Sequence, residues 1–208
     1  MSRDSILHRI RTAVGRSAGQ PPAPPPPVRL SIPEVPLQAR IASVMARVEA
    51  LAGKAVRTDD PRAYVAEAIA GKSAVASNAP LLAECGITSL PGVRSGITDH
   101  EELRELCATT DFGITSADYV LADTGTLVML SSQREARLIS LLPPAHIAVV
   151  TRERILTGLD ELLTVLPHPA EETSSMVLIT GPSRTADIEQ ILVRGVHGPG
   201  QITVVIAG

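Results

Sequence analysis

The chain has 208 residues, of which 44% are hydrophobic and 20% are charged, and this is the composition of an ordinary globular protein with one substantial core. Its formal net charge is −3, so no global positive charge draws it to nucleic acids or anionic lipids. It contains no Trp, one Phe and two Tyr, which leaves no platform on which bases could stack. The composition argues against a nucleic-acid-binding protein.

The sequence also argues against a redox cofactor and a membrane span. The two cysteines, Cys85 and Cys107, do not form a CxxC motif, and an iron–sulfur cluster generally needs more thiolates than two cysteines supply. No G-x-G-x-x-G fingerprint indicates a dinucleotide or flavin. No apolar run approaches the ~20 residues of a transmembrane helix, and no secretory core follows the N-terminus. We therefore expect a cytoplasmic protein without a cofactor or a bound metal.

The N-terminal part predicts an appendage to one domain. Within residues 1–20, Ile6, Ile10 and Val14 recur at helical spacing, so we expect an amphipathic helix over Arg3–Val14 that is separable from the rest. Residues 21–36 hold eight prolines, which favour an extended polyproline II tether. A ligand for a proline-binding module is the alternative. The domain itself is expected over residues 37–208.

Helices dominate the first half of this domain. A three- and four-residue apolar repeat predicts a helix over Leu37–Leu51, and Gly53 follows it as a stop. A second helix should begin near Pro61 and end at Gly71. The remaining elements expected there are a strand at Ser73–Ser77, a helix through Leu81–Cys85 and a helix across Asp99–Ala108.

Strands dominate the second half. Tyr119–Ala122 and Thr126–Leu130 flank an Asp-Thr-Gly turn and predict a hairpin. Short apolar runs predict buried strands, and a helix is expected between two of them. These elements are strands at His146–Val150, Met176–Thr180 and Ile202–Ile206, and a helix at Ile155–Leu166. Short apolar strands that alternate with helices indicate an α/β protein whose sheet is covered on both faces.

Two motifs resemble signatures of other proteins. Asp123-Thr124-Gly125-Thr126 matches the aspartic-protease sequence, but the chain has one copy and the surrounding pattern is not all-β. A hairpin turn made by Asp123 and Gly125 explains it better. Ala70-Gly71-Lys72-Ser73 ends like a P-loop, but Ala66 stands where the first glycine is needed. We interpret Gly71 as a helix end and Lys72-Ser73 as the entry to a strand.

The segment Gly181–Glu189 is the richest in chemistry. A predicted strand leads into Gly181, Ser183 and Arg184, and Thr185 is placed to cap a following helix. Free N–H groups, hydroxyls and a guanidinium could bind an anion there. A capped loop with Arg184 in a structural ion pair explains the same residues, and both interpretations stay open.

Two histidines are also candidates. His197, in the Val196–Gly200 turn, could present a proton donor or acceptor, although a tight turn with an exposed histidine explains it equally well. His146 lies in an apolar run, and there we expect a buried, hydrogen-bonded histidine.

Several stretches together resemble the LUD-domain family, in its lactate utilisation protein C type. They are SRDSILHRIRTAVGR, GITSADYVLADTGTLVMLSS, LLPPAHIAVV, ITGPSRTADIE and GVHGPGQITVVI. Two departures are the Asp123 turn, where the family usually has Glu, and the proline-rich tether. The resemblance implies a fold like that of phosphosugar isomerases and CoA-transferases, a Rossmann-like, mostly parallel sheet with helices on both faces.

The same resemblance implies a function. We expect an accessory, non-redox subunit beside iron–sulfur proteins that oxidise L-lactate to pyruvate. The alternatives are a stand-alone enzyme that binds a phosphorylated or CoA-linked small molecule at Gly181–Thr185, and a structural scaffold. Whether the chain is itself catalytic stays open.

The predicted ligand-binding residues come from three Gly-containing loops. They are Thr124, Gly125, Thr126, Gly181, Ser183, Arg184, Thr185, Asp187, His197 and Gly198. Because ligands collect at the carboxyl ends of parallel strands, we expect the loops to converge on one cleft there, with Arg184 facing His197.

Overall fold

The computed structural model of the chain describes residues 2–17, 19, 32–185 and 193–208, and it divides into two units, Met1–Leu30 and Ser31–Gly208. In the first unit, helix α1 (Arg3–Ala13) begins at Ser2, whose Oγ accepts a hydrogen bond from the Ser5 N–H. The apolar stripe of α1 is exposed, with Ile10 at 54%. The predicted helix is confirmed, whereas most of the predicted tether lies outside the described residues.

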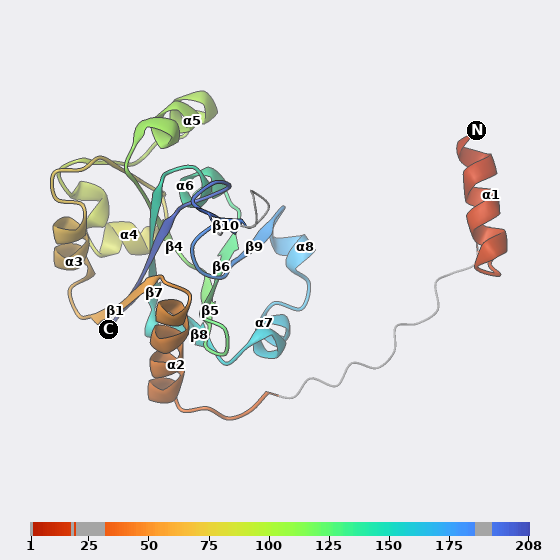
Figure 1. Cartoon of the computed structure of the whole chain (residues 1–208), viewed down its shortest axis with the longest axis horizontal. Coiled ribbons are helices and arrows are strands. Elements are labelled where there is room, and N and C mark those ends of the chain that lie inside the picture. Colours follow the sequence, from red (N-terminus) through yellow and green to blue (C-terminus); the bar gives the residue numbers. More distant parts are fainter. Residues whose placement is uncertain (1, 18, 20–31, 186–192) are drawn as a thin grey trace. The chain divides into compact units, whose positions relative to one another are not determined.

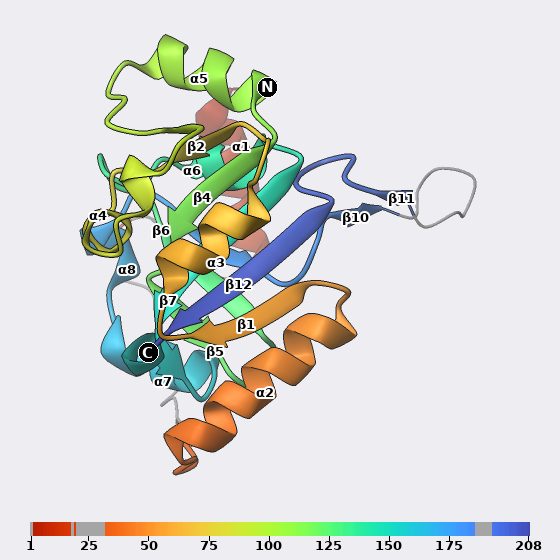
Figure 2. The ribbon, with the colours of Figure 1, turned by 90° about the vertical axis from the view of Figure 1, so that its left-hand side faces the viewer.

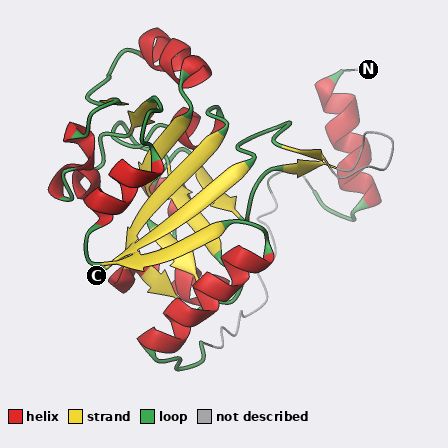
Figure 3. Cartoon of the chain, turned by 60° about the vertical axis from the view of Figure 1, so that its left-hand side comes forward, coloured by secondary structure: helices red, strands yellow, loops and turns green. Residues whose placement is uncertain are grey.

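The second unit is built on a six-stranded parallel sheet, in the order β1-β12-β7-β4-β2-β3. Its strands are β1 (Lys54–Thr58), β2 (Ala74–Ala76), β3 (Val93–Arg94), β4 (Phe112–Ser116), β7 (Ala145–Thr151) and β12 (Gln201–Ala207). Figure 1 shows this sheet between two layers, and Figure 3 shows its long central strands side by side. The predicted α/β class with a mostly parallel sheet is confirmed.

Helices cover one face of the sheet, which faces the viewer in Figure 2. This layer contains α3 (Pro61–Ala68), α4 (Pro80–Glu84) and the 3₁₀ turn η1 (Ile87–Ser89). Val65 of α3 and Leu82 of α4 are fully buried there against Ile147 and Val149 of β7. The Asp60 carboxylate caps α3 by accepting from the Ala63 N–H at 2.9 Å.

The opposite face is covered by helix α2 (Leu37–Ala50) and by a second, four-stranded sheet in the order β8-β5-β6-β9. Its strands are β5 (Tyr119–Leu121), β6 (Thr126–Leu130), β8 (Ile155–Leu156) and β9 (Met176–Ile179). Val44 and Val48 of α2 are buried with Val150 and Val204 of the parallel sheet. Strands β5 and β6 pair antiparallel, as the hairpin prediction required. A small sheet thus stands where a layer of helices alone was expected.

Helices α5 (His100–Thr109) and α6 (Arg137–Leu141) pack beside β2 and β4. A Cβ at Gly113 of β4 would lie 1.9 Å from the carbonyl oxygen of Ile139 in α6, so only glycine permits this approach. The other elements are the 3₁₀ turn η2 (Arg152–Arg154), α7 (Leu159–Val165), α8 (Pro169–Glu172), and an antiparallel pair of β10 (Arg184–Thr185) and β11 (Val193–Arg194).

Two expectations need correction. Ile155–Leu166 is not one helix, because Ile155 and Leu156 pair with β5 and Gly158 takes an extended conformation before α7. Strand β9 lies in the antiparallel sheet and is only partly buried, with Leu178 44% exposed. Thr185 pairs with Val193 in a two-stranded ladder, and the helix that it was predicted to cap lies outside the described residues. No helix in the described part of the chain is long and apolar enough to span a bilayer.

Candidate functional site

The topology of the parallel sheet opens a crevice at its carboxyl edge. After β2 the chain enters α4 on one face, whereas after β4 it enters β5 and β6 on the other. Neighbouring strands whose connections diverge in this way leave space between their carboxyl ends, where α/β proteins commonly bind ligands. A hollow of about 420 Å³ lies there, within the range of roughly 300–1,000 Å³ of small-molecule sites. We call it the carboxyl-edge pocket.

The turn Ser132–Glu135 closes one side of this pocket. The Ser132 Oγ accepts hydrogen bonds from the backbone N–H groups of Arg134 and Glu135, at 3.2 and 3.1 Å. The Arg134 carbonyl accepts from the Asn78 N–H at 2.9 Å, which fastens the turn to the chain just after β2. Hydrogen bonds within the turn and to the chain after β2 therefore fix its backbone, which carries the charged side chains of Arg134 and Glu135.

Glu135 is a buried carboxyl group at the carboxyl-edge pocket. It is 8% exposed, and its Oε2 accepts from the Ser77 hydroxyl at 2.7 Å, while Oε1 has no hydrogen-bond partner among the described residues. Burial raises the pKa of Glu135 to about 8, because the Ser77 hydroxyl and the Ser116 N–H, which lower it, do not offset the lost solvation. At neutral pH the group is mostly a carboxylic acid, able to donate a proton or to accept one back.

A second carboxyl group lies opposite. Asp118 follows β4, and its Oδ2 accepts from the Leu130 N–H at 2.7 Å. Burial raises the pKa of Asp118, although the Leu130 N–H and the Arg154 guanidinium act in the other direction. The Arg154 guanidinium also stands 5.2 Å from the centre of the Tyr119 ring. The negative charge of Asp118 raises the pKa of Glu135 further.

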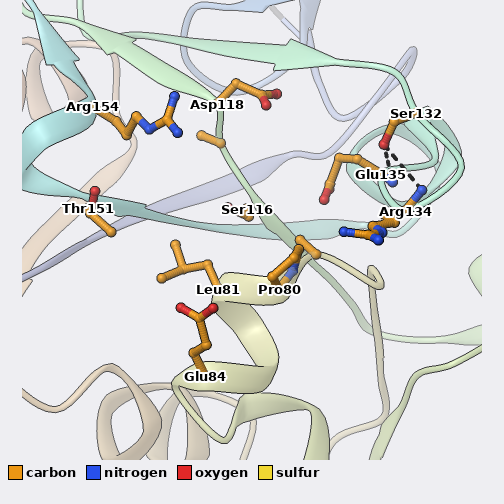
Figure 4. A pocket seen from close by; sticks show the side chains of 12 residues that line it. Pro80, Leu81, Glu84, Ser116, Asp118, Ser132, Arg134, Glu135, Thr151 and Arg154 are labelled. Atoms are coloured by element: carbon orange, nitrogen blue, oxygen red, sulfur yellow. Dashed lines mark hydrogen bonds between the residues drawn. The ribbon is translucent and has the colours of Figure 1, made fainter.

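Figure 4 shows how the charged side chains surround the carboxyl-edge pocket. Arg134 and Glu135 reach in from one side, Arg154 lies on the other with Asp118 between them at the top, and Glu84 at the end of α4 points up from below. Arg134, Arg154 and Glu84 are solvent-exposed, so they form the rim, and Glu135 forms part of the floor. The arrangement can hold a small polar molecule and exchange a proton with it.

The structure brings five of the predicted site residues together elsewhere. Gly181, Ser183, Arg184, His197 and Gly198 line a second hollow of about 500 Å³. The Ser183 N–H donates to the Pro199 carbonyl at 2.9 Å, so the two loops lie side by side. Both Arg184 and His197 are exposed. We call this region the amino-edge hollow, because the second loop precedes β12 and is bonded to the residue before β7.

The Asp123–Thr126 turn does not line this hollow, so the expected single cleft of three loops at the carboxyl ends is wrong. Gly125 has a φ of +70°, and a Cβ there would lie 2.9 Å from the Arg47 Cβ of α2. The Thr126 hydroxyl contacts those of Thr124 at 2.7 Å and Thr180 at 2.9 Å. The turn thus packs against α2 as a hairpin end.

Two predicted site residues remain, and of these Thr185 lines neither hollow. Thr185 belongs to the β10–β11 pair, and Asp187 lies outside the described residues.

Sequence reasoning missed the residues of the carboxyl-edge pocket. They are Ser77, Asp118, Arg134, Glu135 and Arg154. One signal was available, since Asp118 follows Gly-Ile-Thr-Ser-Ala, and recognising β4 there would have placed an acidic residue just after a carboxyl end. Glu135 gave no such signal, because it stands in a polar run that is typical of a surface loop.

The fold defines an α/β protein with a pocket of small-molecule size at the carboxyl edge of a parallel sheet. The LUD domain family matches residues 41–207, and the chain belongs to this family. A solved structure titled as a DUF162 family protein from Deinococcus radiodurans has the same fold, with a TM-score of 0.64 and 17% identity over 84% of this chain and 100% of that one.

Two curated relatives carry functional names. The chain is 36% identical over 143 residues to "Lactate utilization protein C" of Halalkalibacterium halodurans, which is 65% of this chain and 62% of the relative. It is 33% identical over 146 residues to "Lactate utilization protein C 1" of Bacillus mycoides, with the same shares. The matched region therefore spans less than two thirds of the length of these relatives.

Proposed function

We propose that the chain takes part in lactate utilisation, as an accessory, non-redox subunit beside iron–sulfur proteins that oxidise L-lactate to pyruvate. The observation that carries the proposal is membership of the LUD domain family together with the names of its relatives. The partnership with iron–sulfur proteins and the accessory role extend that observation through the family resemblance.

The cysteines support the proposal that partner proteins, and not this chain, carry the electrons. Oxidation of a 2-hydroxy acid to a 2-oxo acid releases two electrons and two protons, and the electrons need an acceptor. The whole sequence holds two cysteines, and burial raises the pKa of Cys107 to about 11 and that of Cys85 above its usual value. Thiols that stay protonated are poor cluster ligands. The electrons are therefore assigned to partner proteins, and binding or proton exchange to this chain.

Growth of the source organism on L-lactate as sole carbon source tests this role. Deleting the gene should abolish or strongly slow that growth, and the wild-type chain should restore it. The double variant Cys85→Ala, Cys107→Ala should restore growth as well, because neither thiol carries electrons in the proposal. Unimpaired growth of the deletion strain, with no second copy present, contradicts the role, and a stable cysteine variant that fails to restore growth contradicts the non-redox assignment.

The amino-edge hollow favours a second candidate, a stand-alone enzyme that binds a phosphorylated or CoA-linked small molecule. Two Gly/Pro loops place the Ser183 hydroxyl, the Arg184 guanidinium and the His197 ring around one hollow. A thermal-shift screen with sugar phosphates and CoA esters tests it, because a ligand well above its Kd raises the melting temperature. A shift that Arg184→Ala removes supports this candidate, and the absence of any shift at millimolar ligand contradicts it.

A further inference from the structure

One buried oxygen atom of a residue that lines the carboxyl-edge pocket has no hydrogen bond with the described residues. Oε1 of Glu135 is shielded from solvent and has no partner in the described part of the chain, whereas buried polar atoms in folded proteins are nearly always bonded. Leaving such a group unpaired is unfavourable, and an oxygen atom of a bound molecule would remove the deficit. Glu135 lines the pocket, so a rotation of its side chain toward the pocket would bring this oxygen to an oxygen of a bound molecule that accepts a hydrogen bond from the Glu135 acid.

Two cations and two carboxyl groups surround Glu135, and Arg134 is the cation that neighbours it in the chain. The titratable groups that face Glu135 are Asp118 after β4, Arg154 at the end of η2, Glu84 at the end of α4 and Arg134 in its own turn. The positive charge of Arg154 lowers the pKa of Asp118, so these two groups act on each other. No ion pair or side-chain hydrogen bond of Arg134 is formed with the residues that the structure describes, and Glu84 points in from the far side. The space beside Glu135 and Arg134 thus suits a negative group.

The two groups come from one turn whose backbone is held by hydrogen bonds. Arg134 and Glu135 are consecutive, and the Ser132 hydroxyl bonds both of their N–H groups. The Arg134 guanidinium can bind a carboxylate, and the neighbouring Glu135 acid can donate a hydrogen bond to an oxygen. This pair of groups matches a molecule that carries a carboxylate and an oxygen on adjacent carbons. Acids that carry a hydroxyl or an oxo group at carbon 2 have this form.

We propose that the carboxyl-edge pocket binds a small 2-hydroxy or 2-oxo carboxylate, with Arg134 holding the carboxylate and the Glu135 acid donating a hydrogen bond to the oxygen on carbon 2. This inference rests on the proposed function and names the ligand class of one site in it. Glu135 contacts the ligand directly, whereas Ser77 is a positioning residue that acts through Glu135. The site needs no partner protein, so the purified full-length chain should bind alone.

Binding is tested by NMR titration of the labelled full-length chain with L-lactate, pyruvate and propionate at pH 6.5 and pH 9. Propionate is the matched probe because it has the carboxylate but no oxygen on carbon 2, and all three acids stay ionised over this range. At pH 6.5 lactate or pyruvate should bind about fivefold more tightly than propionate, which is the effect of one hydrogen bond. At pH 9 the preference of pyruvate over propionate should vanish, because ionised Glu135 no longer donates and the oxo group of pyruvate has no hydrogen to donate in return.

Variants separate the two contacts. In Glu135→Gln the amide donates at both pH values, so the preference over propionate should persist at pH 9. Arg134→Ala should weaken all three acids alike, by about tenfold, since a charge-assisted contact is lost. Ser77→Ala removes a hydroxyl that lowers the pKa of Glu135, so the pH at which the preference is lost should rise. The amide spectrum of each variant shows whether it is folded.

Three results would each overturn the inference. They are equal binding of propionate at pH 6.5, no binding of any acid at tens of millimolar, and a preference at pH 6.5 that Glu135→Gln also loses at pH 9. Because these measurements use the chain alone, they are independent of the growth test. A chain that binds pyruvate but is dispensable for growth contradicts the lactate role and supports the site. A chain that is required for growth but binds none of the acids contradicts the site only.

Discussion

The two hollows of the domain differ in how their polar groups are held. The amino-edge hollow takes its chemistry from Arg184 and His197, which are exposed on Gly/Pro loops. In the carboxyl-edge pocket, Glu135 is buried, tied to Ser77 and left with one unpaired oxygen, and its pKa is raised to about 8. A motif-rich loop marks where a chain must turn, whereas a buried, unpaired acid has a cost in stability that a function would explain.

The largest expected effect concerns the stability of the protein at high pH. The pKa of Glu135 is raised from 4.5 to about 8 on folding, so its stabilising contribution is complete below pH 4.5 and is lost as pH rises through 8. Urea unfolding should show the wild type losing roughly 3–5 kcal/mol between pH 4.5 and 9 relative to Glu135→Gln. Glu84→Gln, at the exposed rim, is the matched control and should follow the wild type. Parallel curves for wild type and Glu135→Gln would show that Glu135 is ionised throughout.

A smaller effect is expected for the contact that sets α6 in place just after Glu135. In Gly113→Ala the new Cβ would meet the Ile139 carbonyl oxygen at 1.9 Å, so α6 must shift. We expect a loss of about 3 kcal/mol in the free energy of unfolding, which is typical of overpacking in a core. The shift should also disturb binding at the carboxyl-edge pocket and leave the amino-edge hollow less affected. Wild-type stability would mean that α6 does not press on β4.

A comparable pH effect of opposite sign is expected at His146, which lies apart from both hollows. Its Nε2 is 2.7 Å from the Thr115 hydroxyl, and complete burial lowers its pKa to about 4. Its stabilising contribution is therefore complete above pH 6.5 and is lost as pH falls through 4. His146→Gln should cost stability at pH 7 but should reduce the acid sensitivity of unfolding between pH 6.5 and 4. Unchanged acid sensitivity would assign the low-pH loss to other groups.

The smallest effect is expected at the amino-edge hollow. Arg184 is exposed, so Arg184→Ala should change the free energy of unfolding by less than about 0.5 kcal/mol. Any anion bound there should be lost at the same time. A large loss of stability would show that Arg184 has a structural role, and the comparison between the two hollows would then fail.

The sequence predicted those elements whose pattern is local. Helix α2 shows a regular apolar repeat, strands β7 and β12 are short apolar runs, and the Asp-Thr-Gly turn marks the β5–β6 hairpin. Strand β4 was missed because Gly113 interrupts its apolar run, and that glycine is explained only by the approach of α6.

The candidate site could not be predicted for a related reason. The environment of Glu135 depends on Ser77, which is 58 positions away, and on the divergence of the chain after β2 and β4. A polar run such as Ser-Ser-Gln-Arg-Glu is typical of an exposed loop, and only the tertiary fold buries one member of it. The Gly/Pro loops could be recognised in the sequence because the backbone conformation of a turn depends on local residues. The buried acid could not, because its burial depends on residues far away in the sequence.

The protonation of Glu135 is the central claim, and the ¹³C chemical shift of its side-chain carboxyl group reports it directly. In the full-length protein with labelled glutamate, the resonance is assigned by its absence in Glu135→Gln and is followed from pH 4 to 10. We expect a titration midpoint near pH 8, and we expect pyruvate to raise it, because the ligand binds the protonated form. A midpoint near the ordinary value of 4.5, unchanged by pyruvate, would contradict the account.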